Sequence, residues 1–144
     1  MPDPDHIDTW LRIDDTTTTS AQPSEADLAA IAALGVRHVV NLGLHTHRKA
    51  LPDEAGTVEA LSMSYVHMPV DFQNPTEADV QAFYNVMQRL KGEPVHVHCI
   101  ANFRVSAFFY RYRTDVLGWT PQDARADLDR IWRPEGVWAA LTKL

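Results

Sequence analysis

The sequence has one cysteine and no long apolar run, and each shortage excludes a class of protein. Cys99 has no partner for a disulfide within the chain, which excludes a disulfide-stabilised secreted scaffold and favours a cytoplasmic location. The apolar run at residues 28–34 is far shorter than the roughly 20 residues that span a bilayer, so we expect no membrane association. The acidic segment 1–6 has no apolar stretch behind it and is not expected to be a signal peptide.

Basic residues and repeats are also scarce. The chain has 13 Lys and Arg residues and 19 Asp and Glu residues, which gives a formal charge of −6. This charge argues against a protein that binds the phosphates of nucleic acid. No internal repeat is present, and the only low-complexity piece is residues 16–19. With 144 residues, 45% of them hydrophobic, the chain is long enough for one globular domain spanning residues 1–144.

Segments typical of strands and of helices alternate along the chain. Runs rich in β-branched residues predict strands, and capping residues followed by apolar positions at helical spacing predict helices. The expected strands are residues 10–13, 36–42, 65–70 and 94–98, and the expected helices are residues 25–34, 54–61, 77–91, 104–117, 121–132 and 137–144. This alternation predicts a three-layer α/β/α fold around a mostly parallel sheet of four to five strands.

Three polar loops follow predicted parallel strands. They are the loop around His45, the loop that begins at Asp71 and the loop that begins at Cys99. Because ligands of parallel sheets bind at the carboxyl ends of the strands, these loops are expected to meet at one functional edge. The cationic residues 45–49 at that edge favour an anionic substrate, although a merely solvated loop explains them equally well.

The loop that begins at Cys99 joins a buried strand to a helix within a few residues. In that geometry the loop amides and the positive end of the helix favour an anion, and Arg104 adds planar donors suited to a tetrahedral oxyanion. Such surroundings lower the pKa of a cysteine thiol and favour a thiolate nucleophile. The alternative is that Cys99 is a small buried hydrophobic residue, as most lone cysteines are.

Five segments of the chain carry motifs that point in the same direction. They are Ser20-Ala-Gln-Pro-Ser24 and residues 39–42, 66–75, 97–107 and 129–132. Together they resemble the cysteine-dependent protein tyrosine phosphatases, in the small bacterial dual-specificity-like branch related to beta-lactamase-hydrolase-like phosphatases. The resemblance implies a metal-independent phosphatase without cofactors that forms a cysteinyl-phosphate on Cys99. Its substrate would be an anionic phosphate monoester, either a small molecule or a phosphoprotein, with phosphotyrosine as one candidate.

The resemblance also implies roles for single residues. The phosphate-binding loop would consist of Ile100, Ala101, Asn102, Phe103 and Arg104. Asp71, just after the preceding strand, occupies a position similar to that of the general acid, although aspartate also begins many turns. His98 would order the loop, and Ser106 falls where a hydroxyl stabilises the leaving thiolate.

The Cys99 loop departs from the usual pattern of that family. Four residues, rather than five, separate Cys99 from Arg104, and none of the four is glycine. The shorter spacing is that of rhodanese-like sulfurtransferases, so a sulfurtransferase and a non-catalytic phosphate- or anion-binding module are the alternatives. Sulfur transfer does not need an acid, and Asp71 therefore discriminates between the two enzymes.

Histidines and arginines near the loop allow two further interpretations. Zinc could in principle be held by His45, His47, His96, His98 and Cys99. We predict no metal site, because the loop around His45 has no carboxylate at ligand spacing and the phosphatase resemblance already explains His98. Arg111 and Arg113, further along the helix that follows the loop, are expected to be solvated.

Overall fold

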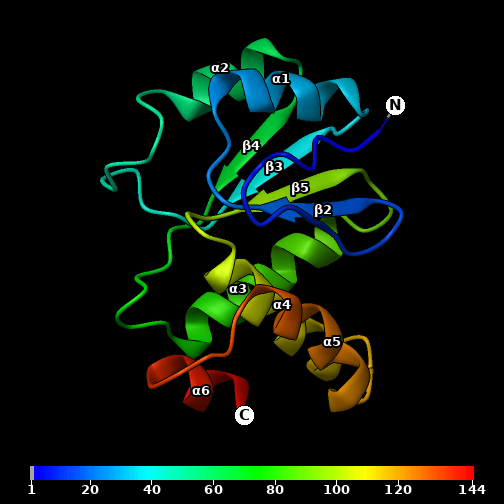
Figure 1. Ribbon diagram of the computed structural model, residues 1–144, viewed down its shortest axis with the longest axis vertical. Coiled ribbons are helices and arrows are strands. Elements are labelled where there is room, and N and C mark those ends of the chain that lie inside the picture. The colour runs from blue at the N-terminus through cyan, green and yellow to red at the C-terminus, as the bar shows by residue number, and fades with distance from the viewer. Residues whose placement is uncertain (1) are drawn as a thin grey trace.

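The computed structural model describes residues 2–144 and contains one five-stranded sheet. The strands are β1 (Leu11–Arg12), β2 (Thr17–Ser20), β3 (His38–Asn41), β4 (Ser64–His67) and β5 (Val95–His98). They lie in the order β1-β2-β5-β3-β4, and every pair is parallel except β1 with β2. Helices cover both faces of the sheet (Figure 1), which confirms the predicted three-layer fold.

The central strand β5 determines where the functional loops lie. Its last residue, His98, is opposite Ser20 of β2 and Asn41 of β3, and Asn41 is opposite His67 of β4. The carboxyl ends of the four parallel strands are therefore level with one another. As a result, the loops that follow these strands meet at one edge of the sheet.

Side-chain caps mark where α1, α2, α3 and α5 begin. The helices within residues 2–144 are α1 (Glu25–Ala33), α2 (Glu54–Ala60), α3 (Glu77–Arg89), α4 (Phe103–Asp115), α5 (Pro121–Ile131) and α6 (Val137–Thr142). The predicted capping boxes of Ser24 with Asp27 and of Thr76 with Asp79 are both formed. Thr120 caps α5, whose first residue is a proline, as expected for an N-terminal turn. No helix within residues 2–144 has both the length and the apolar composition needed to cross a bilayer.

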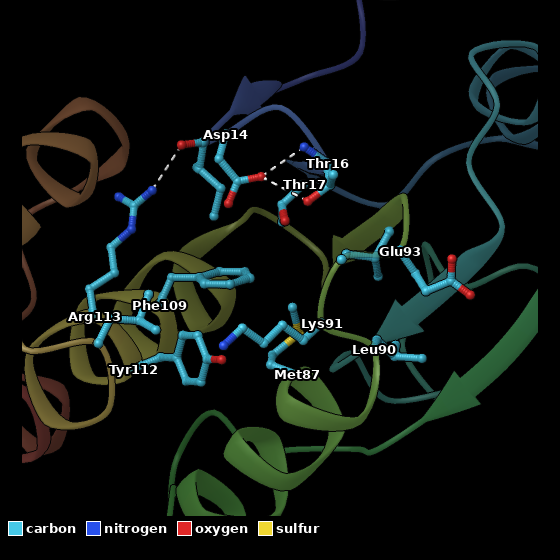
Figure 2. A pocket seen from close by; sticks show the side chains of 14 residues that line it. Asp14, Thr16, Thr17, Met87, Leu90, Lys91, Glu93, Phe109, Tyr112 and Arg113 are labelled. Atoms are coloured by element: carbon cyan, nitrogen blue, oxygen red, sulfur yellow. Dashed lines mark hydrogen bonds between the residues drawn. The ribbon is translucent and has the colours of Figure 1, made fainter.

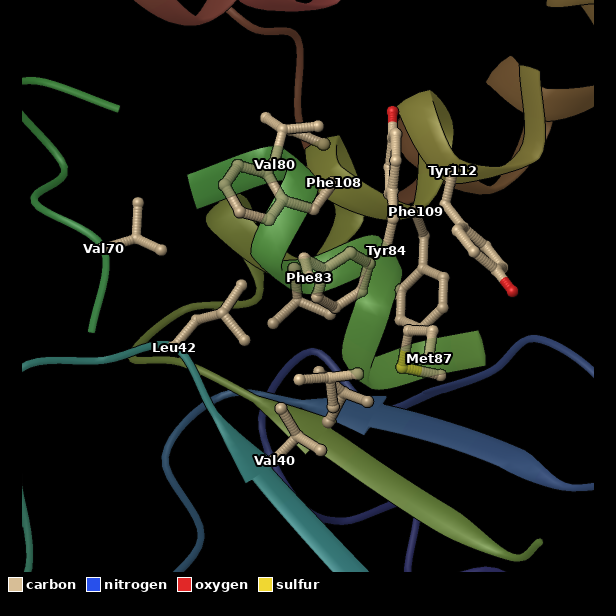
Figure 3. Close-up of a cluster of buried hydrophobic side chains, with 14 of the residues drawn as sticks. Val40, Leu42, Val70, Val80, Phe83, Tyr84, Met87, Phe108, Phe109 and Tyr112 are labelled. Carbon is tan, nitrogen blue, oxygen red and sulfur yellow. The ribbon is translucent and has the colours of Figure 1, made fainter. Parts of the chain in front are cut away.

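Successive side chains of a strand point to opposite faces of the sheet, and this alternation divides the core. Val39 belongs to the hydrophobic cluster beneath α1 and α2, whereas Val40 belongs to the larger cluster beneath α3, α4 and α6. Figure 3 shows that larger cluster, in which the rings of Phe83, Tyr84, Phe108, Phe109 and Tyr112 are labelled, and to which Trp138 also belongs. β5 directs Val97 into it, and the neighbouring His98 consequently faces the α1–α2 side, where it contacts α2.

The strand β2 was not predicted, because residues 16–19 were interpreted as low-complexity sequence. All four of its residues are buried, and the hydroxyl groups of Thr18, Thr19 and Ser20 have partners. Thr18 and Ser20 hydrogen-bond the two ring nitrogens of His96 at 2.8 and 2.9 Å, and Thr19 donates to the carbonyl oxygen of Leu11. These partners allow a polar strand to occupy an interior position of the sheet.

Arg111 and Arg113 are buried, contrary to the expectation that they are solvated. The whole segment 104–113 of α4 is buried, since α4 packs against α3, α5 and α6. Arg111 donates to Glu77 at 2.7 Å and to Asp115 at 2.8 Å. Arg113 likewise pairs with Asp127. Peripheral carboxylates thus allow the central helix to carry two buried guanidinium groups.

Candidate active site

A cleft of about 420 Å³ lies at the carboxyl edge of the sheet. The loops after β3, β4 and β5 all contribute to its walls, as the topology predicts. The cleft is lined by Leu44, His47, Asp71, Phe72, Gln73, Cys99, Ile100, Ala101, Phe103 and Arg104. Cys99 is fully buried and forms the base of the cleft. The cleft therefore brings together the residues proposed as nucleophile, phosphate-binding arginine and acid.

Asn102 gives the Cys99 loop the backbone conformation that glycine usually provides. Its φ is +69°, in the left-handed region that asparagine tolerates better than most residues. The side chain is fully buried, and Nδ2 donates to the carbonyl oxygen of Thr9 at 2.9 Å and to Oγ1 of Thr19 at 3.0 Å. The absence of glycine from this loop is thereby explained: the turn is made by an asparagine that β2 and the N-terminal segment hold in place.

The backbone of the loop offers donors for an anion. Among residues 2–144, no protein acceptor takes a hydrogen bond from the amides of Ile100, Ala101 or Asn102. These amides immediately precede the N-terminus of α4, a helix of 13 residues. Consecutive free amides in a turn at a helix N-terminus form a concave site for a negatively charged group.

Arg104 connects the Cys99 loop with the loop that carries Asp71. Its Nη1 donates to the carbonyl oxygen of Val70 at 2.9 Å, and its guanidinium lies 5.6 Å from the centroid of the Phe72 ring. The side chain is buried, yet its Nε has no hydrogen-bond partner among the described residues. A buried donor without a partner is costly, and an oxyanion in the cleft would satisfy it.

Asp71 is exposed at the mouth of the cleft. One of its carboxylate oxygens accepts a hydrogen bond from the amide of Gln73 at 2.9 Å, and its carbonyl oxygen accepts one from Asn74. Asp71 therefore does begin a turn, as the structural interpretation of the sequence expected. Because it also lines the cleft with Cys99, the turn places its carboxyl group where an acid would be needed.

Ser106 lies in the first turn of α4, but its hydroxyl has other partners than the Cys99 sulfur. It donates to the carbonyl oxygen of Phe103 at 3.1 Å and accepts from Nε1 of Trp132 at 3.1 Å. The indole of Trp132 is also stacked on the Phe103 ring, with centroids 4.4 Å apart. Ser106 thus connects the C-terminal end of α5 with the start of α4, next to the Cys99 loop.

Glu54 contacts His98, the residue before Cys99, and sequence reasoning did not single it out. It is buried, and its Oε2 lies 2.6 Å from Nε2 of His98 while its Oε1 accepts from Gln22 at 2.8 Å. The other ring nitrogen of His98 lies 2.9 Å from the carbonyl oxygen of Cys99. An acid at the start of a helix normally needs no partner other than the helix dipole, so no sequence signal distinguished Glu54.

The histidines considered as zinc ligands have other partners. Both ring nitrogens of His96 are bonded to hydroxyl groups of β2, and those of His98 to Glu54 and the Cys99 carbonyl. The ring of His45 is stacked on that of His67, with centroids 3.6 Å apart. Within residues 2–144, no three His, Cys, Asp or Glu side chains form a group that could hold a metal ion.

Residues 12–131 match the family described as "DSP-PTPase phosphatase fused to NAD+ kinase". The chain belongs to this phosphatase family. A beta-lactamase hydrolase-like protein of Agrobacterium fabrum is 29% identical over 102 residues, which cover 69% of this chain and 23% of that protein. The chain thus spans about a quarter of the length of this curated relative.

Solved structures agree with this phosphatase family. The crystal structure of a DUF442 protein from Shewanella putrefaciens CN-32 superposes with a TM-score of 0.85 at 32% identity, covering 96% of this chain and 91% of that one. TpbA of P. aeruginosa shares the fold, with a TM-score of 0.68 at 23% identity over 86% of this chain and 72% of that one. The predicted family and the protein tyrosine phosphatase-like fold are confirmed.

This phosphatase-family chain has a second cavity, of about 190 Å³, at the opposite edge of the sheet (Figure 2). It lies at the amino ends of β2 and β5, between the end of α3 and the middle of α4. Met87, Phe109 and Tyr112 form its apolar wall, and Lys91 and Asp14 are at its rim. None of its lining residues belongs to the Cys99 cleft, which remains the place where the family's chemistry would occur.

Proposed function

We propose that this chain hydrolyses phosphate monoesters through a cysteinyl-phosphate intermediate on Cys99, with Asp71 as the general acid. The observation that carries the proposal is the cleft itself. The segment after β5 brings to it a cysteine and a buried arginine donor that has no partner among the described residues, and the loop after β4 brings an aspartate. Membership of a phosphatase family supports the same reaction class.

In the first step, the Cys99 thiolate attacks the phosphorus of the monoester and a sulfur–phosphorus bond forms. The bond between phosphorus and the ester oxygen breaks, and Asp71 gives its proton to the departing oxygen. Arg104 Nε and the amides of Ile100 to Asn102 stabilise the negative charge on the phosphate oxygens. In the second step, water attacks the phosphorus and transfers a proton to Asp71. Inorganic phosphate leaves, and the thiolate is restored.

The cleft walls favour a phosphate carried on an apolar group. Leu44, Phe72, Ile100 and Phe103 line it, and among these Phe72 and Phe103 place their ring centroids 6.4 Å apart. His47, from the loop after β3, adds a group that is cationic when protonated. The TpbA structure was determined with pTyr, which supports a phosphorylated substrate for a chain of the same fold. A small aryl phosphate or a phosphotyrosine of a protein is the substrate class proposed.

The test is hydrolysis of p-nitrophenyl phosphate in the presence of EDTA by the wild-type chain and by Cys99→Ser. We expect turnover by the wild-type chain and none above background by the variant, because serine lacks the thiolate. Asp5→Asn, a change at an exposed carboxylate that does not line the cleft, is the control and should leave the rate unchanged. Activity that survives Cys99→Ser, or that requires added zinc, would refute the proposal.

A rhodanese-like sulfurtransferase is the second candidate, because four residues separate Cys99 from Arg104. It predicts transfer of sulfur from thiosulfate to cyanide at a rate that Asp71→Asn does not change. If neither reaction occurs but phosphate still binds to the cleft, the chain is an anion-binding module.

A further inference from the structure

We propose that Glu54 is a positioning residue that keeps His98 doubly protonated, so that a fixed positive charge lies directly behind the nucleophilic loop. The inference deepens the proposed function and rests on the assignment of Cys99 as nucleophile. It starts from a contact between two buried side chains: Glu54 on α2 and His98 on β5, 2.6 Å apart.

The hydrogen bonds around His98 define where its protons are. Nδ1 of His98 lies 2.9 Å from the carbonyl oxygen of Cys99, and a carbonyl oxygen can only accept, so Nδ1 carries a hydrogen. Nε2 faces the Glu54 carboxyl group. If that carboxyl group is ionised, Nε2 must also carry a hydrogen, and His98 is an imidazolium ion.

The surroundings of Glu54 favour the ionised form. Burial raises the pKa of Glu54, but the hydrogen bonds from His98 and Gln22 and the charge of His98 outweigh it, and the pKa is lower than its usual value. Gln22 Nε2 donates to Oε1 of Glu54 at 2.8 Å, and Nε2 of His98 lies 2.6 Å from Oε2, so each carboxyl oxygen has a nitrogen partner. A buried carboxylate needs such partners, and this arrangement supplies one at each oxygen.

The other titratable groups near the pair are His96, Tyr65 and His45. His96, whose ring stacks against His98, has a pKa well below the usual value because it is fully buried and lies near the charge of His98, so it is neutral. On β4, burial raises the pKa of Tyr65 to about 12, so its phenol is neutral as well. His45, in the loop after β3, lies near Glu54 and is hydrogen-bonded to the Tyr65 hydroxyl.

The position of the charge explains what Glu54 would do. The imidazolium N–H is directed at the carbonyl of the residue that carries the nucleophilic sulfur. A nearby positive charge favours the thiolate over the thiol. The carboxylate also fixes the ring, so that the loop and α2 are held together through a single side chain.

Glu54→Gln tests this role because it removes the charge while keeping the hydrogen bonds. The amide nitrogen of glutamine can donate to Nε2 of a neutral His98, which still donates from Nδ1 to Cys99, and its oxygen can still accept from Gln22. A purely structural role therefore predicts little change. The proposed role predicts a neutral His98 and a thiolate that forms only at higher pH.

Two measurements on the full chain report on this without turnover. Nitrogen-15 spectra of the histidine rings, with His98 assigned by its loss in His98→Asn, should show both nitrogens protonated at neutral pH in the wild-type chain. In Glu54→Gln one nitrogen should lose its proton. Because the chain has one cysteine, ultraviolet absorbance of the thiolate reports on Cys99 alone, with Cys99→Ser as the blank. Its midpoint should move up by about one pH unit or more in Glu54→Gln.

Glu77→Gln is the matched control, since it makes the same substitution in an ion pair with Arg111 outside the cleft. It should change neither readout. A singly protonated His98 in the wild-type chain overturns the inference, as does a thiolate midpoint that Glu54→Gln leaves in place. If Glu54→Gln does not fold, the wild-type spectra and Glu54→Asp, which retains the charge, still decide the question. Failure of the proposed phosphatase reaction gives a different result: both readouts behave as expected, but p-nitrophenyl phosphate is not hydrolysed.

Discussion

Replacing Asn102 tests whether this residue shapes the Cys99 loop. In Asn102→Ala the chain loses the two hydrogen bonds to Thr9 and Thr19, which contribute about 1 kcal/mol each. Alanine at φ +69° adds about 1–2 kcal/mol of backbone strain. We therefore expect the free energy of unfolding to fall by about 3–4 kcal/mol, a large part of the stability of a domain this size.

Asn102→Gly separates the two contributions. It loses the same hydrogen bonds but adopts the left-handed conformation without strain. Its additional cost is the greater freedom of glycine in the unfolded chain, about 0.7 kcal/mol. The expected order of stability is wild type, then Asn102→Gly, then Asn102→Ala, with about 1 kcal/mol between the two variants.

Stability is measured by urea unfolding, with circular dichroism as the signal. The shape of the loop is measured by how well added phosphate protects Cys99 from an alkylating reagent. Asn102→Gly should retain more of that protection than Asn102→Ala, because its loop can keep its shape. If Asn102→Ala equals or exceeds Asn102→Gly in stability, the left-handed conformation is not what selects asparagine here. If both variants are as stable as the wild type, the two side-chain hydrogen bonds of Asn102 do not contribute to the free energy of unfolding.

Three further predictions follow from the contacts described. In steady-state assays, Asp71→Asn should slow the hydrolysis of an alkyl phosphate by about 10²–10⁴-fold and that of p-nitrophenyl phosphate much less. Equal losses on both substrates would show that Asp71 is only a turn residue. Arg111→Met should lower the free energy of unfolding, measured in urea titrations, by about 2 kcal/mol. The reason is that the Arg111 guanidinium is buried, whereas its carboxylate partners reach solvent. A change below about 0.5 kcal/mol would contradict this. The lowered pKa of Glu54 contributes stability that is present above the pKa of an unfolded glutamate, about 4.5, and lost as the pH falls through the folded value. Urea unfolding between about pH 3 and 7 should therefore show a shallower loss of stability in Glu54→Gln than in the wild type.

Local signals in the sequence predicted most of the fold. Capping residues such as Ser24, Thr76 and Thr120 act on the few residues beside them, so their effect can be inferred without knowing the rest of the structure. The strand before Cys99 was predicted for the same reason, because its valines alternate with histidines over a short run. Topology then predicted correctly that the loops of Asp71 and Cys99 share one cleft.

What the sequence could not predict depends on contacts between distant residues. The strand β2 consists of threonines and a serine, and the burial of Thr18 and Ser20 depends on hydrogen bonds to His96, which lies 78 and 76 positions away. Arg111 was expected to be solvated because helical spacing does not reveal that α3 and α6 cover that side of α4. Glu54 was missed for the same reason, since its partner His98 is 44 residues away.

The stacking of Trp132 on Phe103 provides a fluorescent reporter next to the Cys99 loop. Phe103 lines the cleft, and the indole lies parallel to its ring with an interplanar angle of 2°. Indole fluorescence is sensitive to a change in such a neighbour, so occupation of the cleft by phosphate should alter the emission of Trp132. Comparison with Trp132→Phe assigns the signal among the four tryptophans. Anion binding can then be measured by tryptophan fluorescence, even in Cys99→Ser, which is not expected to hydrolyse the substrate.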